Sequence, residues 1–149
     1  MAINDYALAG NDTMGVYAPN QWITGDMNVA TAPGRIAPGL VLDKYTVLAR
    51  NTSNQLVPLD PAQTDGRQNA VSILLHAINT TAAQATTPLG VVLPANPAGA
   101  VETITEVYIA GVFNPDLAVW PASLPYVPGS SVARARQFDR TNIHMQRPL

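Results

Sequence analysis

The chain has no cysteine in its 149 residues, which excludes a disulfide framework and any thiolate chemistry. Charge is also sparse, because Asp, Glu, Lys and Arg make up only 12% of the residues, against about 25% in a typical globular domain. Lys44 is the only lysine. Monomeric domains usually keep a more charged surface for solubility. We therefore expect other copies or a partner to cover part of this surface. The alternative is an uncharged but soluble surface of Thr, Asn and Gln.

Features that direct a chain to a membrane or through one are also lacking. No lysine or arginine precedes Arg35, so we expect neither a secretory leader nor an arginine-rich transit peptide. Proline breaks the longest uncharged apolar runs well before the ~20 residues that a membrane helix needs. The sequence predicts a soluble protein with no membrane partner.

Residue sets for catalysis or metal binding are missing as well. His76 and His144 are the only histidines, whereas structural zinc sites use four Cys or His ligands at tight spacing. Residues 60–66 lack the ligand pattern of a calcium loop. Glu102 and Glu106 would lie ~13 Å apart on one face of a strand, too far for a glycosidase pair. No nucleotide-binding or hydrolase motif occurs. We predict no catalytic residues, no cofactor and no metal.

The two ends of the chain differ in charge. The last twenty residues carry four arginines and one aspartate, and the first 34 carry three aspartates and no basic residue. A nucleic-acid site needs denser Lys and Arg with interleaved aromatic rings, so we expect no nucleic-acid partner. The opposite charges either orient subunits or partners, or are unrelated surface charge.

Residues 1–34 are rich in Asn, Asp, Gly and Thr and show no sustained period of 2 or 3.6. This pattern predicts an extended N-terminal arm and a folded domain that begins at residue 35. The arm is nevertheless too apolar for a plain solvated linker. Its apolar side chains include Tyr17, Trp22, Ile23, Met27 and Val29. Composition alone leaves open whether they pack on the domain's own core or on a partner.

From residue 35 onward the pattern favours β-structure. The predicted strands are 40–48, 56–57, 70–78, 90–93, 101–113 and 132–140. Pro58 and Pro61 restrict the second of these to a sheet edge. Residues 70–78 are apolar on both faces, as in a buried strand, although a pair of helical turns is an alternative for so short a run.

Turn and helix signals complete the pattern. Asp65 and Gly66 supply a turn in which glycine takes the positive φ. Asn114, Pro115 and Asp116 predict the start of a short helix, with Asn as the N-cap, Pro in the first position and Asp at the positive end of the dipole. Pro121 ends this helix.

Two blocks, residues 55–81 and 105–121, contain an ordered set of motifs. The set is Leu56 and Val57 with Asp60, Thr64–Asp65–Gly66, the apolar run 70–77, Thr80 and Thr81, the strand 107–113, and Trp120–Pro121. In this order the set resembles the head decoration proteins that cement the capsids of lambda-type tailed bacteriophages. Residues 30–34 and 37–42 also resemble that family. The connection 80–100 is longer than the family's, which indicates an insertion.

The resemblance implies a mainly β, β-tulip-like decoration domain over residues 35–149, with one short helix and a capsid-binding arm over residues 1–34. It implies a non-enzymatic cement protein that binds the major capsid protein as a homotrimer, at three-fold and quasi-three-fold sites of the expanded head, and stabilises the head against DNA pressure. Such a protein is made in the host bacterial cytoplasm and lies on the outer capsid surface of the virion.

The resemblance also assigns roles to residues. Those implied to bind the capsid are Tyr17, Trp22, Ile23, Met27 and Val29. Those implied to maintain the family's structure are Asp65, Gly66, Trp120 and Pro121. Two other functions are considered: a further virion subunit such as a tail-tube protein, and a surface β-domain that binds a glycan or a protein. An enzyme would need residue sets that the chain lacks.

Overall fold

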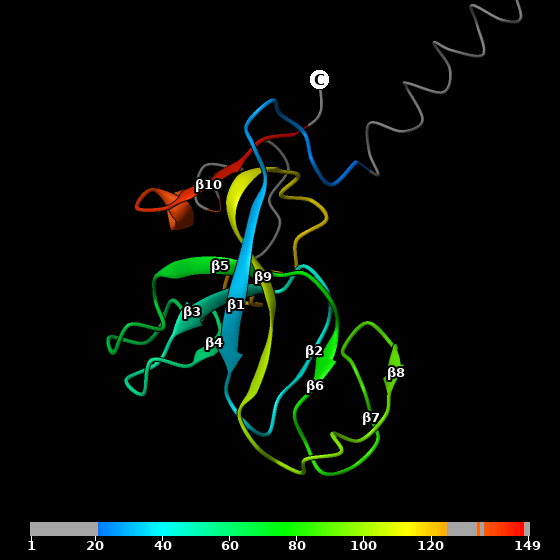
Figure 1. Ribbon diagram of the computed structural model, residues 1–149. Helices are drawn as coiled ribbons and strands as arrows, with labels where there is room; N and C mark the ends of the chain where they lie inside the picture. Colours follow the sequence, from blue (N-terminus) through cyan, green and yellow to red (C-terminus); the bar gives the residue numbers. More distant parts are fainter. Residues whose placement is uncertain (1–20, 125–133, 135, 148–149) are drawn as a thin grey trace, which may run out of the picture.

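The computed structural model describes residues 21–124, 134 and 136–147, and these residues form mainly β-strands (Figure 1). The strands are β1 (Ala30–Ile36), β2 (Val41–Leu42), β3 (Val47–Arg50), β4 (Leu56–Pro58), β5 (Ala70–Leu74), β6 (Ile78–Asn79), β7 (Ala85–Thr86), β8 (Val92–Leu93), β9 (Thr103–Phe113) and β10 (Asn142–Met145). The prediction of a mainly β domain is confirmed. No helix among these residues is long and apolar enough to cross a membrane.

Six strands form one sheet in the order β1-β4-β3-β5-β9-β10. β1 also pairs with β9 in an antiparallel register along its whole length, so the sheet closes on itself like a small barrel. β10 adds to β9 in parallel, outside the closed part. β9 therefore borders three strands, which makes it the central element of the domain.

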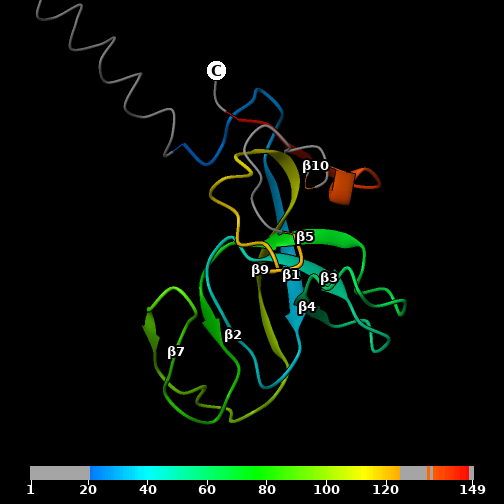
Figure 2. The same ribbon diagram turned by 180° about the vertical axis from the view of Figure 1, so that it is seen from behind.

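Two short antiparallel pairs lie outside this sheet: β2 with β6, and the hairpin of β7 with β8. In both views the β7–β8 hairpin lies at the end of the domain opposite to residues 21–29 (Figures 1 and 2). The hairpin includes the predicted strand at 90–93 and belongs to the connection that was interpreted as an insertion. The two ends of the domain are thus free to make different contacts.

The core lies on both faces of the sheet. Val47 and Ala49 of β3 pack into one hydrophobic cluster, and Leu48 between them packs into the other. Ile73 and Leu74 of β5 divide in the same way. Since successive side chains of a strand point to opposite faces, strands buried on both faces read as continuous apolar runs. This explains why the segments around β3 and β5 lack a polar–apolar alternation.

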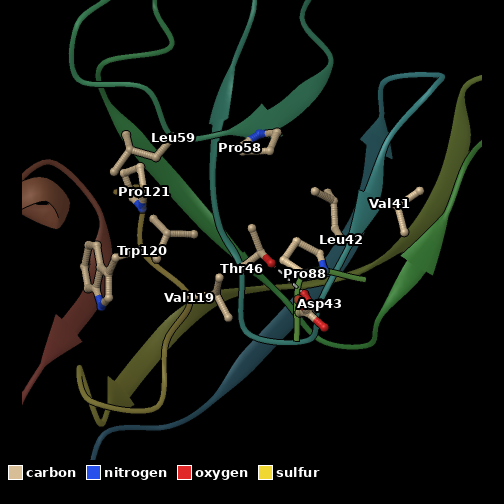
Figure 3. A pocket seen from close by; sticks show the side chains of 11 residues that line it. Val41, Leu42, Asp43, Thr46, Pro58, Leu59, Pro88, Val119, Trp120 and Pro121 are labelled. Carbon is tan, nitrogen blue, oxygen red and sulfur yellow. Dashed lines mark hydrogen bonds between the residues drawn. The ribbon is translucent and has the colours of Figure 1, made fainter. Parts of the chain in front are cut away.

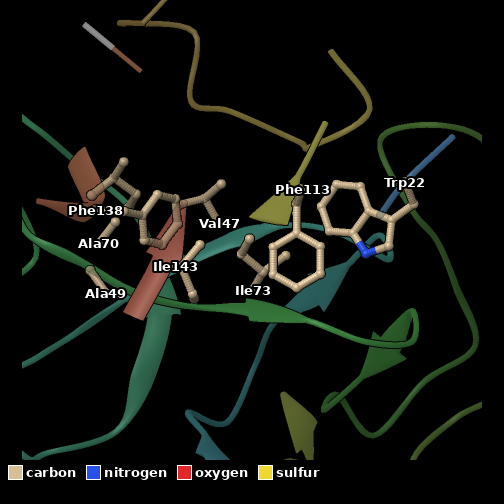
Figure 4. Close-up of a cluster of buried hydrophobic side chains, with 9 residues drawn as sticks. Trp22, Val47, Ala49, Ala70, Ile73, Phe113, Phe138 and Ile143 are labelled. Carbon is tan, nitrogen blue, oxygen red and sulfur yellow. The ribbon is translucent and has the colours of Figure 1, made fainter. Parts of the chain in front are cut away.

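Trp22 belongs to the first of these clusters and is only 8% exposed (Figure 4). Its ring stacks on Tyr45 and Phe113, with centroid distances of 3.9 and 4.8 Å. Its carbonyl oxygen accepts a hydrogen bond from the Asn114 backbone N–H at 2.8 Å. The structure therefore corrects the interpretation of Trp22 as a capsid-binding side chain, because a ring enclosed by its own domain is not available to a partner.

The chain is also continuous with the domain across the predicted boundary between residues 34 and 35. Thr24 N–H donates to the Val112 carbonyl at 3.0 Å, and Ile23 forms an antiparallel bridge with Phe113. β1 then runs from Ala30 to Ile36 beside β9. Residues 22–36 thus pack against the domain and extend its sheet.

The helix predicted to start at Asn114 is not formed. The Asn114 side-chain oxygen accepts from Asp116 N–H at 3.0 Å, which makes a single capped turn. Val119 then bridges to the strand region instead, where its N–H donates to the Tyr45 carbonyl at 2.8 Å and its carbonyl accepts from Val47 N–H at 3.1 Å. A helix of a few residues is costly to nucleate, and pairing with the sheet satisfies the same backbone groups. The motif instead closes a turn.

Three other predictions differ in detail. β4 is not an edge strand, because β3 and β1 flank it. The predicted strand 70–78 is interrupted by a bend at residues 75–77, which leaves His76 exposed. The predicted strand 132–140 is replaced in its described part by a short 3₁₀ helix, η2 (Arg136–Phe138), which places Phe138 in the core. The last strand is β10.

Candidate functional site

Residues 23–29, termed here the exposed segment, connect the buried Trp22 ring to β1. Three large apolar side chains in it, Ile23, Met27 and Val29, are exposed to solvent. Asp26 is the only charged residue in the segment. These three are among the side chains predicted to bind the capsid. The fourth remaining candidate, Tyr17, lies outside the described residues.

The backbone of the exposed segment is held firmly against the domain. Thr24 Oγ1 donates to the Gln146 carbonyl at 2.6 Å, so the segment is tied to the chain next to β10. Gly25 lies directly over Val112, since a Cβ on residue 25 would fall 2.8 Å from the Val112 Cβ. Val29 lies over Gly111, whose φ of +140° and missing side chain accommodate this close approach. An ordered backbone therefore presents the apolar side chains.

The aromatic cluster beneath this segment is packing and not a reactive site. Burial raises the pKa of Tyr108, and the nearby Tyr45 adds to the rise, while the Trp22 indole opposes it. A tyrosine with a raised pKa stays neutral at physiological pH. The Trp22 Nε1 atom is buried and makes no hydrogen bond within normal geometry. The cluster is thus an uncharged support for the exposed segment.

Trp120 and Pro121, predicted as family-motif residues, follow the bridge between Val119 and Thr46, and Trp120 packs against the hydrophobic cluster that contains Trp22. Trp120 Nε1 donates to the Pro115 carbonyl at 2.8 Å. Its ring packs edge-on against Phe138 at 6.1 Å, and the Arg134 guanidinium lies 5.4 Å from the ring centroid. Both Trp120 and Pro121 also line an apolar cavity. The contacts described for Trp120 thus lie within the domain.

Asp65 and Gly66 form a turn beside β3. The Asp65 carboxylate pairs with the Arg67 guanidinium at 2.9 Å, and the side-chain hydrogen bond from Arg67 holds the pKa of Asp65 below its usual value. Gly66 has a φ of +110°, and a Cβ there would lie 2.9 Å from the Arg50 carbonyl oxygen. The turn thus needs glycine for both its dihedral angle and its space.

Substitution Gly66→Ala is expected to lower the free energy of unfolding by about 2–3 kcal/mol, from left-handed strain together with a backbone clash. Gly39→Ala is the matched control, because Gly39 has a φ of +78° and no atom near the position of a Cβ. It should cost only about 1 kcal/mol. Urea denaturation of both variants measures the difference. Equal losses would show that the contact with Arg50 does not constrain residue 66.

The two glutamates do not form an acid–base pair. Glu102 accepts a bidentate pair of hydrogen bonds from Arg35, at 2.8 and 2.9 Å, and a third from Gln55 at 2.7 Å. These bonds, with Arg35 the largest cause, lower the pKa of Glu102. Glu106 is exposed on β9, which begins one residue after Glu102. The Glu102 carboxylate therefore joins β1 to β9 and the Asn51–Gln55 turn.

The lowered pKa of Glu102 predicts a pH-dependent contribution to stability. A depressed folded-state pKa adds stability above the unfolded-state value of about 4.3, and that stability is lost as the pH falls through the folded-state value. The difference in stability between the native chain and Glu102→Gln should thus be larger at pH 7 than at pH 3. Urea denaturation at both pH values tests this. Glu106→Gln, which removes a carboxylate without an ion pair, should show a smaller change.

The exposed apolar side chains of the β7–β8 hairpin were not identified from the sequence. Leu89, Val91 and Val92 all lie at or near its tip and are exposed. The segment was interpreted as an inserted connection with a strand at 90–93, and no exposed apolar tip was predicted. The available signal was the run of Leu and Val without any charged neighbour, which does not by itself distinguish a buried strand from an exposed tip.

Among the described residues, no three His, Asp or Glu side chains gather in a way that could hold a metal ion. The closed sheet, its two-sided core and the apolar exposed segment define a small β-domain suited to binding another protein. The chain belongs to the family of the bacteriophage lambda head decoration protein D, because the model of that family matches residues 9–95. The suspected family is thereby confirmed. No individual curated protein gives a match to the chain.

The family assignment identifies the protein as a structural component of a bacteriophage virion with a role in capsid decoration. The matched region includes the exposed segment, strands β1 to β8 and the Asp65–Gly66 turn. The second motif block, residues 105–121, lies beyond it. The assignment favours head decoration over the tail-tube and cell-surface alternatives.

Proposed function

We propose that this protein is a non-enzymatic cement protein that binds the major capsid protein on the outer surface of an expanded phage head. It acts as a homotrimer at three-fold and quasi-three-fold sites and holds neighbouring capsid subunits together against the pressure of the packaged DNA. It is made in the host bacterial cytoplasm. The observation that carries this proposal is the exposed segment, an apolar surface within the N-terminal arm that is held against the domain.

The buried Trp22 ring gives this surface its rigidity. Ordering a residue costs about 1–2 kcal/mol of backbone entropy. A residue that is already ordered in the free protein does not incur this cost again when it binds. Ile23 bridges to Phe113 and Val29 lies over Gly111, so both ends of the exposed segment are held on β9 before binding. Burial of its three apolar side chains against the shell then carries a smaller ordering cost. At about 25 cal/mol per Å² of apolar surface, each side chain contributes about 1 kcal/mol.

The remainder of the arm, with Tyr17, extends the contact towards the capsid protein. Addition of a strand to an exposed sheet edge is the binding mode that we propose for it, since backbone hydrogen bonds then supply affinity without a specific side-chain pattern. Three arms in one trimer would act together, and the second and third contacts form at high effective concentration.

Electron microscopy of expanded heads mixed with the purified protein tests this function. We expect density at the three-fold and quasi-three-fold positions, a trimeric mass by sedimentation, and greater resistance of the heads to rupture on heating. Heads that remain bare at saturating protein concentration would contradict the proposal. Binding without any gain in head stability would retain the decoration role and remove the cement role.

A further inference from the structure

The β7–β8 hairpin exposes an unusually apolar tip. Leu89 is 70% exposed and Val92 is 58% exposed, and they are two of the three most exposed large hydrophobic side chains in the described part of the chain. Val91 lies between them in the loop and is also exposed. Contiguous apolar patches on a soluble domain commonly mark interaction sites.

The conformation of this tip is fixed within the monomer. Buried Thr87 receives a backbone hydrogen bond from Gly90 at 2.9 Å, and its own N–H donates to the Val91 carbonyl at 2.8 Å. Leu89 N–H donates to the carboxylate of Asp43, itself only 3% exposed, at 3.1 Å. The loop is thus ordered before any contact is made, which reduces the entropic cost of binding through it.

An apolar cavity of about 140 Å³ lies next to the hairpin (Figure 3). Its apolar lining includes Leu42, Pro58, Pro88, Val119, Trp120 and Pro121. Apolar cavities of about 150 Å³ accommodate a group the size of benzene, and the four-carbon side chain of leucine is smaller. The cavity therefore has room for the side chain of Leu89 from another chain.

The charge pattern favours a second copy of this chain as the occupant. No Asp, Glu, Lys or Arg occurs between Gln68 and Val101, a run that includes the whole hairpin. The uncharged tip meets the cavity without like-charge repulsion, and Asp43, the charged residue of the cavity wall, is already buried in the monomer, so the contact desolvates no further ion. Pro88 belongs to the cavity wall and directly precedes Leu89, so the tip and the cavity share one side of the domain.

We propose that Leu89, at the tip of β7–β8, inserts into the cavity next to Pro58 and Trp120 of a neighbouring copy. Because the tip and the cavity lie close together in each copy, the copies can form a closed ring around a symmetry axis. In this ring the tip of each copy enters the cavity of the next copy, and its own cavity holds the tip of the previous one. The inference rests on the proposed homotrimer and assigns its interface. Because the hairpin lies opposite to the exposed segment, this interface leaves the shell contact free (Figures 1 and 2).

Cysteine cross-linking between two single variants tests the contact directly, because the chain has no cysteine of its own. Leu89→Cys and Pro58→Cys chains are co-expressed and oxidised, in solution and on decorated heads. A disulfide that joins the two different chains is expected. Ile104→Cys with Pro58→Cys is the matched control, since Ile104 is 67% exposed on β9, and this pair should not cross-link.

A second measurement is the concentration at which the oligomer dissociates. Leu89→Asp should raise this concentration about thirtyfold, the effect of losing a central interface residue, whereas Ile104→Asp should change it less than about threefold. If native oligomers decorate heads but the 89–58 pair does not cross-link, or if only 89–89 disulfides form, this interface is wrong and the proposed function stands. A native chain that stays monomeric in solution and on heads overturns both the interface and the trimer.

Discussion

Substitution Trp22→Ala is expected to lower the free energy of unfolding by about 3–5 kcal/mol, as truncation of a buried tryptophan or phenylalanine commonly does. The indole stacks on Tyr45 and Phe113 in the main cluster, so its removal leaves a cavity between β9 and the chain that precedes β3. Since native domains are stable by only about 5–15 kcal/mol, the loss is large. Urea denaturation followed by near-ultraviolet circular dichroism measures it.

Ile23→Ala provides the control for this prediction, because Ile23 is adjacent in sequence but exposed. Its effect on stability should remain below about 1 kcal/mol. If Trp22→Ala leaves stability unchanged while binding to heads is lost, the ring contacts the shell and not the core. Both variants keep residues 1–20 intact, so that part of the arm does not contribute to the comparison.

The triple substitution of Ile23, Met27 and Val29 by serine is expected to weaken binding to expanded heads about a hundredfold per arm. Three contacts of about 1 kcal/mol each give this factor. The melting temperature should change little, because all three side chains are exposed in the free protein. Titration of heads with labelled protein, followed by sedimentation, measures the affinity.

Val101→Ser with Ile104→Ser is the control for this loss of affinity, since both side chains are exposed near the start of β9, away from the exposed segment. This double variant should bind heads as the native protein does. Equal losses in the two variants would indicate that general surface hydrophobicity drives binding. Unchanged affinity of the triple variant would remove the exposed segment from the shell contact.

Local signals in the sequence were sufficient for much of the sheet. The apolar run around Ile73 and the long run that became β9 were both identified as strands, although helical turns remained an alternative for the shorter run. Gly66 was assigned to a turn because an Asp-Gly pair supplies the positive φ of a turn, and Gly66 has a φ of +110°. In these segments the local preference agrees with the fold.

Long-range contacts decided the positions where prediction failed. Asn114 and Pro115 have the sequence of a helix start, yet Val119 pairs with Tyr45 and Val47, some seventy residues earlier in the chain. Trp22 was assigned to the arm because its neighbours lack periodicity, and its burial depends on Tyr45 and Phe113. Local patterns carry no information about such partners, so the packing of Trp22 and β1 against the domain was not predicted.

The antiparallel pairing of β1 with β9 has a mechanical consequence. A pull on the N-terminal arm from a swelling shell would reach the domain through Thr24 and β1, which lies antiparallel to β9 over seven residues. Where the pull runs along the axis of β1, it loads the backbone hydrogen bonds between β1 and β9 in shear. These hydrogen bonds then share the force and do not open one after another. The buried Trp22 ring would also have to leave the hydrophobic cluster before β1 could slide along β9. In the proposed cement role, force on the arm would therefore reach the domain through its longest strand pairing.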